Sequence, residues 1–166
     1  GSSLSSFGGE RAGTRAKLAS PHIFDGSYTE EYNVLNWFLA VEQYLYNCDV
    51  SYQLFSSYAY TYLARVVQAW FDNHFNSQPT PPWHMTVTAM KGRYLPTDHE
   101  TRLLRRFTGI KQQRTLQEYV DRFQILVSAM QLAGIFLSDT EMVHQFIDGL
   151  RNHDDCINFL VRKLEN

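Results

Sequence analysis

The sequence lacks the features of secreted proteins, membrane proteins and strongly basic nucleic-acid-binding proteins. Its two cysteines, Cys48 and Cys156, lie far apart and belong to no C-x-x-C pair, which favours two reduced thiols in an intracellular protein over a disulfide. No apolar run approaches the roughly 20 residues that a membrane-spanning helix needs. The net charge of −2 argues against a surface that is basic throughout. We therefore expect a soluble, cytoplasmic protein without a membrane partner.

Motifs for catalysis and for cofactors are also missing. The sequence has no D-[ST]-G of an aspartic protease, no G-x-S-x-G and no phosphate-binding G-x-x-x-x-G-K-[ST]. Its histidines form no H-E-x-x-H, so no metal site is expected. It contains neither a Cys-Cys-His-Cys knuckle nor an RNP-type aromatic motif, so base-specific RNA recognition is unsupported. We predict no enzymatic activity and no cofactor.

Helical periodicity is what the sequence does contain. A chain of 166 residues can bury roughly 70% of its unfolded surface, which allows a substantial core. Apolar residues recur at helical spacing, and no segment alternates convincingly as a strand would. The sequence thus predicts an all-α protein of two small helical-bundle lobes. Helices are expected over about 29–47, from about Ser51 to Phe75 with a bend near 64–65, over 81–95 behind a Thr80 cap, over 98–108 and over 115–131, with one more from Ser138 and one after Asn152.

Helix starts suggest where the chain divides. A Ser or Thr followed three residues later by Glu predicts a capping box, and this pattern occurs at Thr97–Glu100, Thr115–Glu118 and Ser138–Glu141. Pro96 ends the preceding helical pattern, so a linker is expected at 94–97. Residues 1–20 begin with a tag-like Gly-Ser and are too poor in apolar residues to fold alone. We predict a disordered tail over 1–20, a first lobe over 21–96 and a second lobe over 97–166.

The most informative stretch reads Ile-Lys-Gln-Gln-Arg-Thr-Leu-Gln-Glu-Tyr-Val-Asp-Arg-Phe over 110–123. Its Glu-Tyr-Val-Asp-Arg-Phe, preceded by Ile-Lys-Gln, resembles the major homology region of retroviral capsid proteins and the equivalent segment of gypsy-class retrotransposon Gag and Arc-like proteins. Phe24-Asp-Gly, the segment 63–70 and Lys-Gly-Arg-Tyr-Leu-Pro over 91–96 resemble the amino-terminal lobe of such a Gag. The resemblance covers nearly all of 22–164. It implies a structural capsid protein that assembles with copies of itself into a virus-like shell around nucleic acid.

The resemblance also implies roles for particular residues. Gln112, Glu118 and Arg122 would form a hydrogen-bond network between a loop and the helix from 115, whereas the four-residue spacing of Glu118 and Arg122 alone suggests only a surface ion pair. The helix from Ser138 would supply a two-fold contact through its polar outer face, which comprises Glu141, His144, Gln145 and Asp148. Its apolar residues Met142, Phe146 and Ile147 would serve the core. The sequence stops before the family's usual final helix, so an incomplete second lobe is expected.

Two further groups of residues admit two readings each. The basic residues between positions 91 and 114 form either a solvated surface with ordinary ion pairs or a polyanion patch that contacts RNA through sequence-independent phosphate contacts; they are Lys91, Arg93, Arg102, Arg105, Arg106, Lys111 and Arg114. The aromatics Trp37, Trp70 and Phe71 either pack in the core or line a peptide groove, as in Arc-like proteins. The alternative function is accordingly a domesticated Gag-derived adaptor that binds a peptide in its first lobe without assembling.

Overall fold

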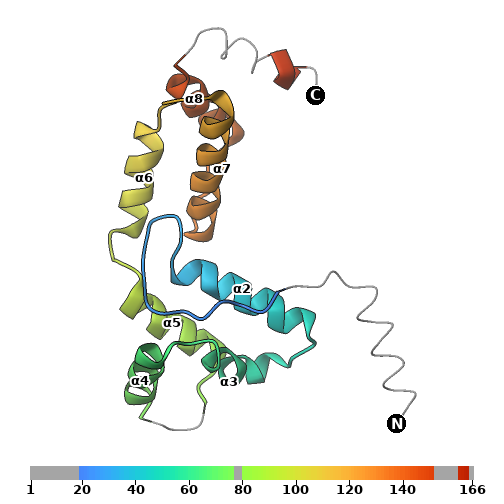
Figure 1. Cartoon of the computed structure of the whole chain (residues 1–166), viewed down its shortest axis with the longest axis vertical. Coiled ribbons are helices and arrows are strands. Elements are labelled where there is room, and N and C mark those ends of the chain that lie inside the picture. The colour runs from blue at the N-terminus through green and yellow to red at the C-terminus, as the bar shows by residue number, and fades with distance from the viewer. Residues whose placement is uncertain (1–18, 77–79, 152–160, 165–166) are drawn as a thin grey trace, which may run out of the picture. The chain divides into compact units, whose positions relative to one another are not determined.

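The computed structural model describes residues 19–76, 80–151 and 161–164 and confirms the all-α class (Figure 1). Between residues 34 and 149 the elements are α2 (Val34–Asn47), η1 (Tyr52–Leu54), α3 (Phe55–Tyr60), α4 (Arg65–His74), α5 (Trp83–Tyr94), α6 (His99–Gly109), α7 (Leu116–Leu132) and α8 (Asp139–Gly149). Residues 161–164 are also helical. The predicted tail, apart from residues 19 and 20, and the predicted helix after Asn152, apart from 161–164, lie outside the described residues.

Internal packing divides the chain into two compact units. One contains the described residues through Tyr28 together with Asn33–Leu95, and the other contains Thr29–Tyr32 together with the described residues from Pro96 onward. The division after Leu95 falls inside the segment 94–97 that the sequence suggested as a linker. Assignment of Thr29–Tyr32 to the second unit was not anticipated from the sequence.

The first helix begins later than predicted because local side chains close a turn in front of it. The Thr29 hydroxyl accepts the Tyr32 amide at 2.9 Å and donates to the Tyr32 carbonyl at 3.0 Å. Asn33 then caps α2: its side-chain oxygen accepts the Leu35 amide at 3.0 Å, and its own amide donates to Asn36 Oδ1 at 2.9 Å. The predicted start at 29 was therefore wrong, since Thr29 closes a turn and Asn33 supplies the cap.

Two other predicted caps are not formed. The helix expected after Thr80 begins at Trp83 behind Pro82, with no side-chain cap, and the Thr80 hydroxyl instead accepts a hydrogen bond from Ser57 at 3.1 Å. The predicted Thr97–Glu100 capping box is wrong as well, because α6 starts one residue later, with Asp98 at the cap position and no side-chain cap bond.

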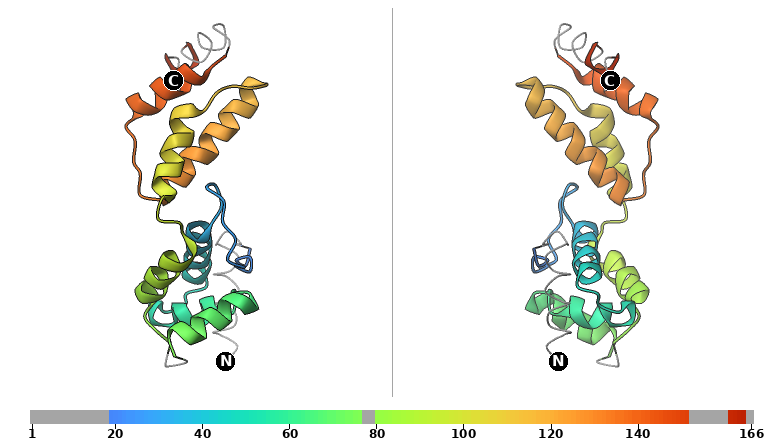
Figure 2. Two further views of the ribbon diagram at one scale, coloured as in Figure 1. Left: turned by 90° about the vertical axis from the view of Figure 1, so that its left-hand side faces the viewer. Right: turned by 90° about the vertical axis from the view of Figure 1, so that its right-hand side faces the viewer.

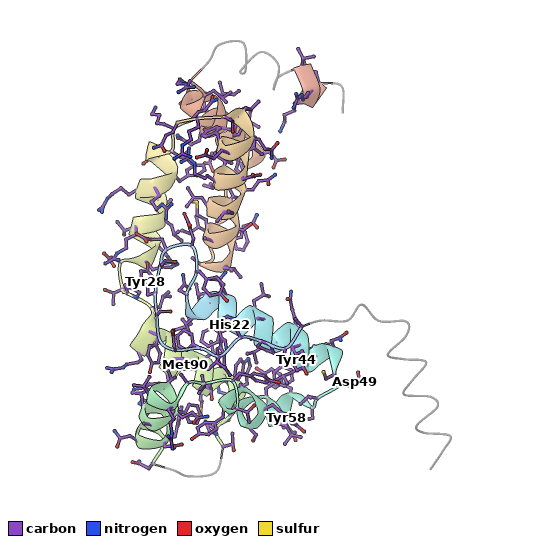
Figure 3. The ribbon with its side chains drawn as sticks, in the orientation of Figure 1. His22, Tyr28, Tyr44, Asp49, Tyr58 and Met90 are labelled. Atoms are coloured by element: carbon purple, nitrogen blue, oxygen red, sulfur yellow. The ribbon has the colours of Figure 1, made fainter. Side chains whose placement is uncertain are left out.

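The first unit is built around a buried cluster of aromatic residues. Trp37 of α2 is fully buried, and its ring centroid lies 5.7 Å from that of Phe24 and 6.4 Å from that of Trp83. An isolated parallel bridge holds Phe24 in place, because its amide donates to Tyr62 O at 2.9 Å and its carbonyl accepts the Ala64 amide at 2.8 Å. Met90 of α5 is also fully buried in this unit (Figure 3).

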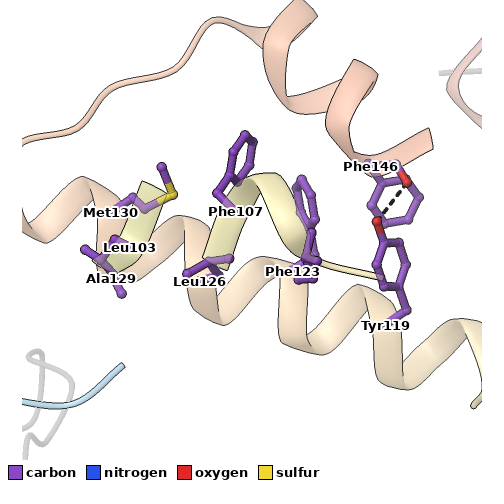
Figure 4. Packing of buried hydrophobic residues seen from close by; sticks show 9 residues of the cluster. Leu103, Phe107, Tyr119, Phe123, Leu126, Ala129, Met130 and Phe146 are labelled. Carbon is purple, nitrogen blue, oxygen red and sulfur yellow. Dashed lines mark hydrogen bonds between the residues drawn. The ribbon is translucent and has the colours of Figure 1, made fainter. Parts of the chain in front are cut away.

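The second unit packs three helices around its own core. α6 and α7 run side by side in opposite directions, and α8 lies near the ends that are joined by residues 110–115 (Figure 2). Their buried side chains form one cluster (Figure 4). The rings of Tyr119, Phe123 and Phe146 meet within it, with Phe146 centroid distances of 4.9 Å to Tyr119 and 5.1 Å to Phe123. Phe146 therefore serves the core as predicted, while Met142 and Ile147 are half-buried.

Candidate functional site

The segment 110–115, which connects α6 to α7, is held by hydrogen bonds at both of its ends. Gln112 is buried, and its backbone amide donates to the carbonyl of Gly149 at 2.8 Å. Its side-chain Nε2 donates to the carbonyl of Arg114 at 3.2 Å, while its Oε1 accepts the backbone amide of Arg151 at 3.1 Å. One buried glutamine thus ties the loop to itself and to the chain that leaves α8.

Arg151 holds the same loop from the other side. Its Nη1 donates to the carbonyl of Gln113 at 2.8 Å, and its Nη2 donates to the carbonyl of Arg114 at 3.3 Å. Guanidinium groups make strong, charge-assisted hydrogen bonds, and two donors on neighbouring carbonyls fix the geometry of the loop. Sequence reasoning missed Arg151. Its only local signal is a basic residue two positions after the end of a helix, which fits many arginines without a structural role.

Arg122 reaches the loop from α7. Its Nη2 donates to the carbonyl of Lys111 at 2.6 Å. Its Nε lies 4.0 Å from Glu118 Oε1, which is too long for a hydrogen bond, and this nitrogen is buried without a hydrogen-bond partner. The guanidinium carbon lies 6.0 Å from the centre of the Tyr119 ring. The bond to Lys111 is therefore the main contribution of Arg122, and the contact with Glu118 is a weak ion pair.

Glu118 has a smaller part in holding the loop than the predicted network gave it. The Thr115 hydroxyl accepts the Glu118 amide at 3.1 Å, which is one half of the predicted capping box. The Glu118 carboxylate lies 3.9 Å from Arg114 Nε, and Arg114 is largely exposed. Gln112 and Arg122 thus bond to backbone carbonyls of this loop. Glu118 instead makes long ion-pair contacts with the side chains of Arg114 and Arg122.

Tyr119 and Gly149 complete the site through a close approach of α7 and α8. The fully buried Tyr119 hydroxyl donates to the Phe146 carbonyl at 2.8 Å, and burial raises the pKa of Tyr119 to about 12. A Cβ on Gly149 would lie 2.1 Å from Tyr119 Oη and 2.6 Å from the carbonyl oxygen of Ile110. Only glycine fits there. We call Gln112, Tyr119, Arg122, Gly149 and Arg151 the loop clasp.

The predicted self-association face of α8 divides into two parts. His144 and Asp148 are exposed and lie 3.4 Å apart, and the Glu141 carboxylate accepts the Ser138 amide at 3.1 Å in a complete capping box. Gln145, in contrast, is half-buried, and its Nε2 is directed at the carbonyl of Thr108 at 3.4 Å. Its assignment to the outer face was wrong, because it faces the end of α6.

The seven predicted basic residues do not form one uniform group. Lys91 and Arg93 belong to the last turn of α5 in the first unit, and the other five belong to the second unit. Arg102 pairs with Asp98 at 2.9 Å, and its hydrogen bond holds the pKa of that carboxyl below the ordinary value. Arg106 pairs with Glu31. Of these five cations, Arg105, Lys111 and Arg114 are exposed, and Arg114 lies 3.9 Å from the Glu118 carboxylate.

The proposed groove aromatics lie mostly inside the first unit. Trp37 and Phe71 are buried, so the reading that places them in an open groove is wrong. Trp70 is half-buried; it stacks on His74 with ring centroids 5.1 Å apart and meets the edge of Tyr94 at 5.4 Å. The groove was suggested by the resemblance, whereas the burial of Trp37 and Phe71 agrees with the alternative reading, core packing.

Three further observations bear on function. Within the described residues, no group of three or more His, Cys, Asp and Glu side chains is arranged to hold a metal ion. No helix in this part of the chain is long and apolar enough to cross a membrane. Comparisons with protein-family models, with curated proteins and with solved structures find no match to this chain.

Proposed function

We propose that this chain is the capsid region of a gypsy-class retrotransposon Gag, or of a host protein derived from one, and that it assembles with copies of itself. Its role would be structural rather than enzymatic, in cytoplasmic virus-like particles that enclose nucleic acid. The two compact helical units are consistent with the two lobes that such a protein needs.

The loop clasp is the observation that carries this proposal. The loop 110–115 is the first part of the segment that resembles the major homology region, and it is held by Arg122 of α7, Gly149 of α8 and Arg151. A subunit that repeats one weak contact many times needs its contacting helix in a fixed orientation, since small errors accumulate over a shell. Gly149, at the end of α8, is bonded to the loop, so the clasp can set the orientation of that helix.

The exposed part of α8 is the proposed contact surface. His144 and Asp148 project from its outer side, and Glu141 lies on its first turn. A contact between two copies of such a polar face would be weak for an isolated pair and would gain strength from multiplicity. RNA contact, in this proposal, is limited to sequence-independent electrostatic attraction to the exposed cations Arg105, Lys111 and Arg114.

The adaptor alternative has less support. It required a first-lobe groove lined by Trp37, Trp70 and Phe71, and two of these three residues are buried in the core. An adaptor that binds a peptide would therefore have to use a different surface.

Charge reversal at the end of α8 tests the proposal. Asp148→Lys should abolish assembly while preserving the fold, because a cation near a helix C-terminus is favourable. Asp121→Lys changes the net charge equally at an exposed position of α7 and should leave assembly intact. Sedimentation and electron microscopy at high protein and salt concentrations measure the outcome. If the unmodified chain stays monomeric throughout, or both variants assemble normally, the proposed contact is wrong.

A further inference from the structure

One side of α2 is left uncovered by the first unit. Leu39 and Tyr46 are 40% and 76% exposed, and they lie seven residues apart on the same stripe of the helix. Together with Glu42, Asp49 and Val50 they line an open groove, which we call the α2 groove. It combines apolar side chains with two carboxylates.

The two carboxylates, Glu42 and Asp49, make this groove acidic. Glu42 is half-buried and accepts the indole N–H of Trp83 at 2.8 Å, so its position is fixed by the core. Asp49 follows the end of α2 and is exposed (Figure 3). No basic residue lines the groove among the described residues. An occupant with basic and apolar side chains would therefore match it in both respects.

The chain reaches the first unit beside this groove. Ser20 is hydrogen-bonded to the hydroxyl of Tyr62, which also shares a hydrogen bond with Tyr44 of α2. The Tyr44 and Tyr62 rings meet edge to face with centroids 6.1 Å apart. Gln43, which neighbours Tyr44 in sequence, lines the groove. Ser20 is thus held close to α2 through Tyr62 and Tyr44.

The composition of residues 1–18 complements the groove. Their charged side chains are Glu10, Arg11, Arg15 and Lys17, so basic residues outnumber acidic ones, and their large apolar side chains are Leu4, Phe7 and Leu18. A segment of this length spans up to roughly 60 Å when extended, whereas the helix rises only about 10 Å between Leu39 and Tyr46. A segment with few apolar residues can still dock on a surface that is already folded.

We propose that the α2 groove binds the chain's own N-terminal segment, with the basic side chains of that segment near Glu42 and Asp49 and its apolar side chains against Leu39 and Tyr46. The tether at Ser20 gives the segment a high effective concentration at the groove, so weak contacts suffice. The docked segment would cover the outer side of α2 and compete with any partner for that surface.

A spin label on Cys48 tests this proposal in the full chain. Cys48 is an exposed free thiol between Asn47 and Asp49, and Cys156→Ser leaves it as the single labelling site. We expect the label to attenuate the amide NMR signals of residues 4–11. Tethering at Ser20 alone would attenuate only the signals of residues close to Ser20 in the sequence. High salt, or Arg15→Glu together with Lys17→Glu, should restore those signals.

A matched pair of variants distinguishes docking from simple tethering. Tyr46→Ser removes an exposed groove side chain and should restore the signals of residues 4–11, whereas Val66→Ser removes a comparably exposed side chain of α4 and should not. The proposal is overturned if attenuation declines smoothly with sequence separation from Ser20 and is the same in the Tyr46→Ser variant. Attenuation found only when labelled chains are mixed with isotope-enriched unlabelled chains also overturns it, because a second copy would then be the occupant.

Discussion

Replacement of Gly149 by alanine is the sharpest test of the loop clasp. The added methyl group would lie 2.1 Å from Tyr119 Oη and 2.6 Å from the Ile110 carbonyl. The tyrosine is fully buried and the carbonyl is backbone, so neither can move aside cheaply. Overpacking of this kind costs about 1–3 kcal/mol. Loss of the bond from Tyr119 to the Phe146 carbonyl costs about 1–3 kcal/mol more.

Gly109 provides the matched control. It ends α6 as Gly149 ends α8, and each is followed by a residue in extended conformation, but a Cβ on Gly109 would meet nothing within 4 Å. Alanine is favoured over glycine in helices by about 0.5–1 kcal/mol. We therefore expect Gly109→Ala to be neutral or slightly stabilising, and Gly149→Ala to lower the free energy of unfolding by about 1–5 kcal/mol after this gain is subtracted.

Urea denaturation followed by circular dichroism measures both variants. The double variant Gly149→Ala with Tyr119→Phe adds a check on the cause, because removal of the hydroxyl makes room for the methyl group. Its loss of stability should be smaller than the sum of the two single losses. Equal stability of Gly149→Ala and Gly109→Ala would refute the close approach described for α8, and strict additivity would refute the role of the Tyr119 hydroxyl.

Two other predictions follow from the same site. Arg122→Ala removes the bond to the Lys111 carbonyl and should lower the free energy of unfolding by about 1–3 kcal/mol, whereas Arg114→Ala, with its exposed side chain, should change it by less than about 0.5 kcal/mol; denaturant titrations that cannot separate the two variants would contradict the assignment. The pKa of Tyr119 is raised from 10.0 to about 12, so the folded chain holds the phenol proton more tightly than the unfolded chain does. The contribution of this proton to the free energy of unfolding is complete below pH 10 and is lost between pH 10 and 12 at about 1.4 kcal/mol per pH unit. The stability difference between the unmodified chain and Tyr119→Phe should follow this course, and a flat difference would exclude it.

The helical class and most helices could be predicted from the sequence because their signals are local. Apolar periodicity and the Ser138 capping box each depend on residues within one or two turns of chain. The errors arose where another local pattern competed. Asn33 and Asn36 form a capping box that a search for Ser, Thr and Glu overlooks, and the turn closed by Thr29 delays the start of α2.

The candidate site was predicted only in part, because its decisive contacts join residues distant in sequence. Gln112, Glu118 and Arg122 fall within eleven residues of one another and were named from one recognisable segment. Arg151 and Gly149 lie almost forty residues from Gln112 in the chain, yet they bond to the loop that contains it. Nothing in their sequence neighbourhood distinguishes an arginine that holds a loop from one that faces solvent.

The burial of Gln112 indicates why this loop has a unique conformation. A buried amide that lacked partners would destabilise the fold by about 1–3 kcal/mol, so each alternative loop arrangement that leaves it unpaired is disfavoured by that amount. In the observed arrangement its backbone amide, Nε2 and Oε1 all have partners, supplied by Gly149, Arg114 and Arg151. Two of these partners lie at or just beyond the end of α8. The polar residue thus selects one orientation of that helix relative to the loop, which apolar packing alone would define less sharply.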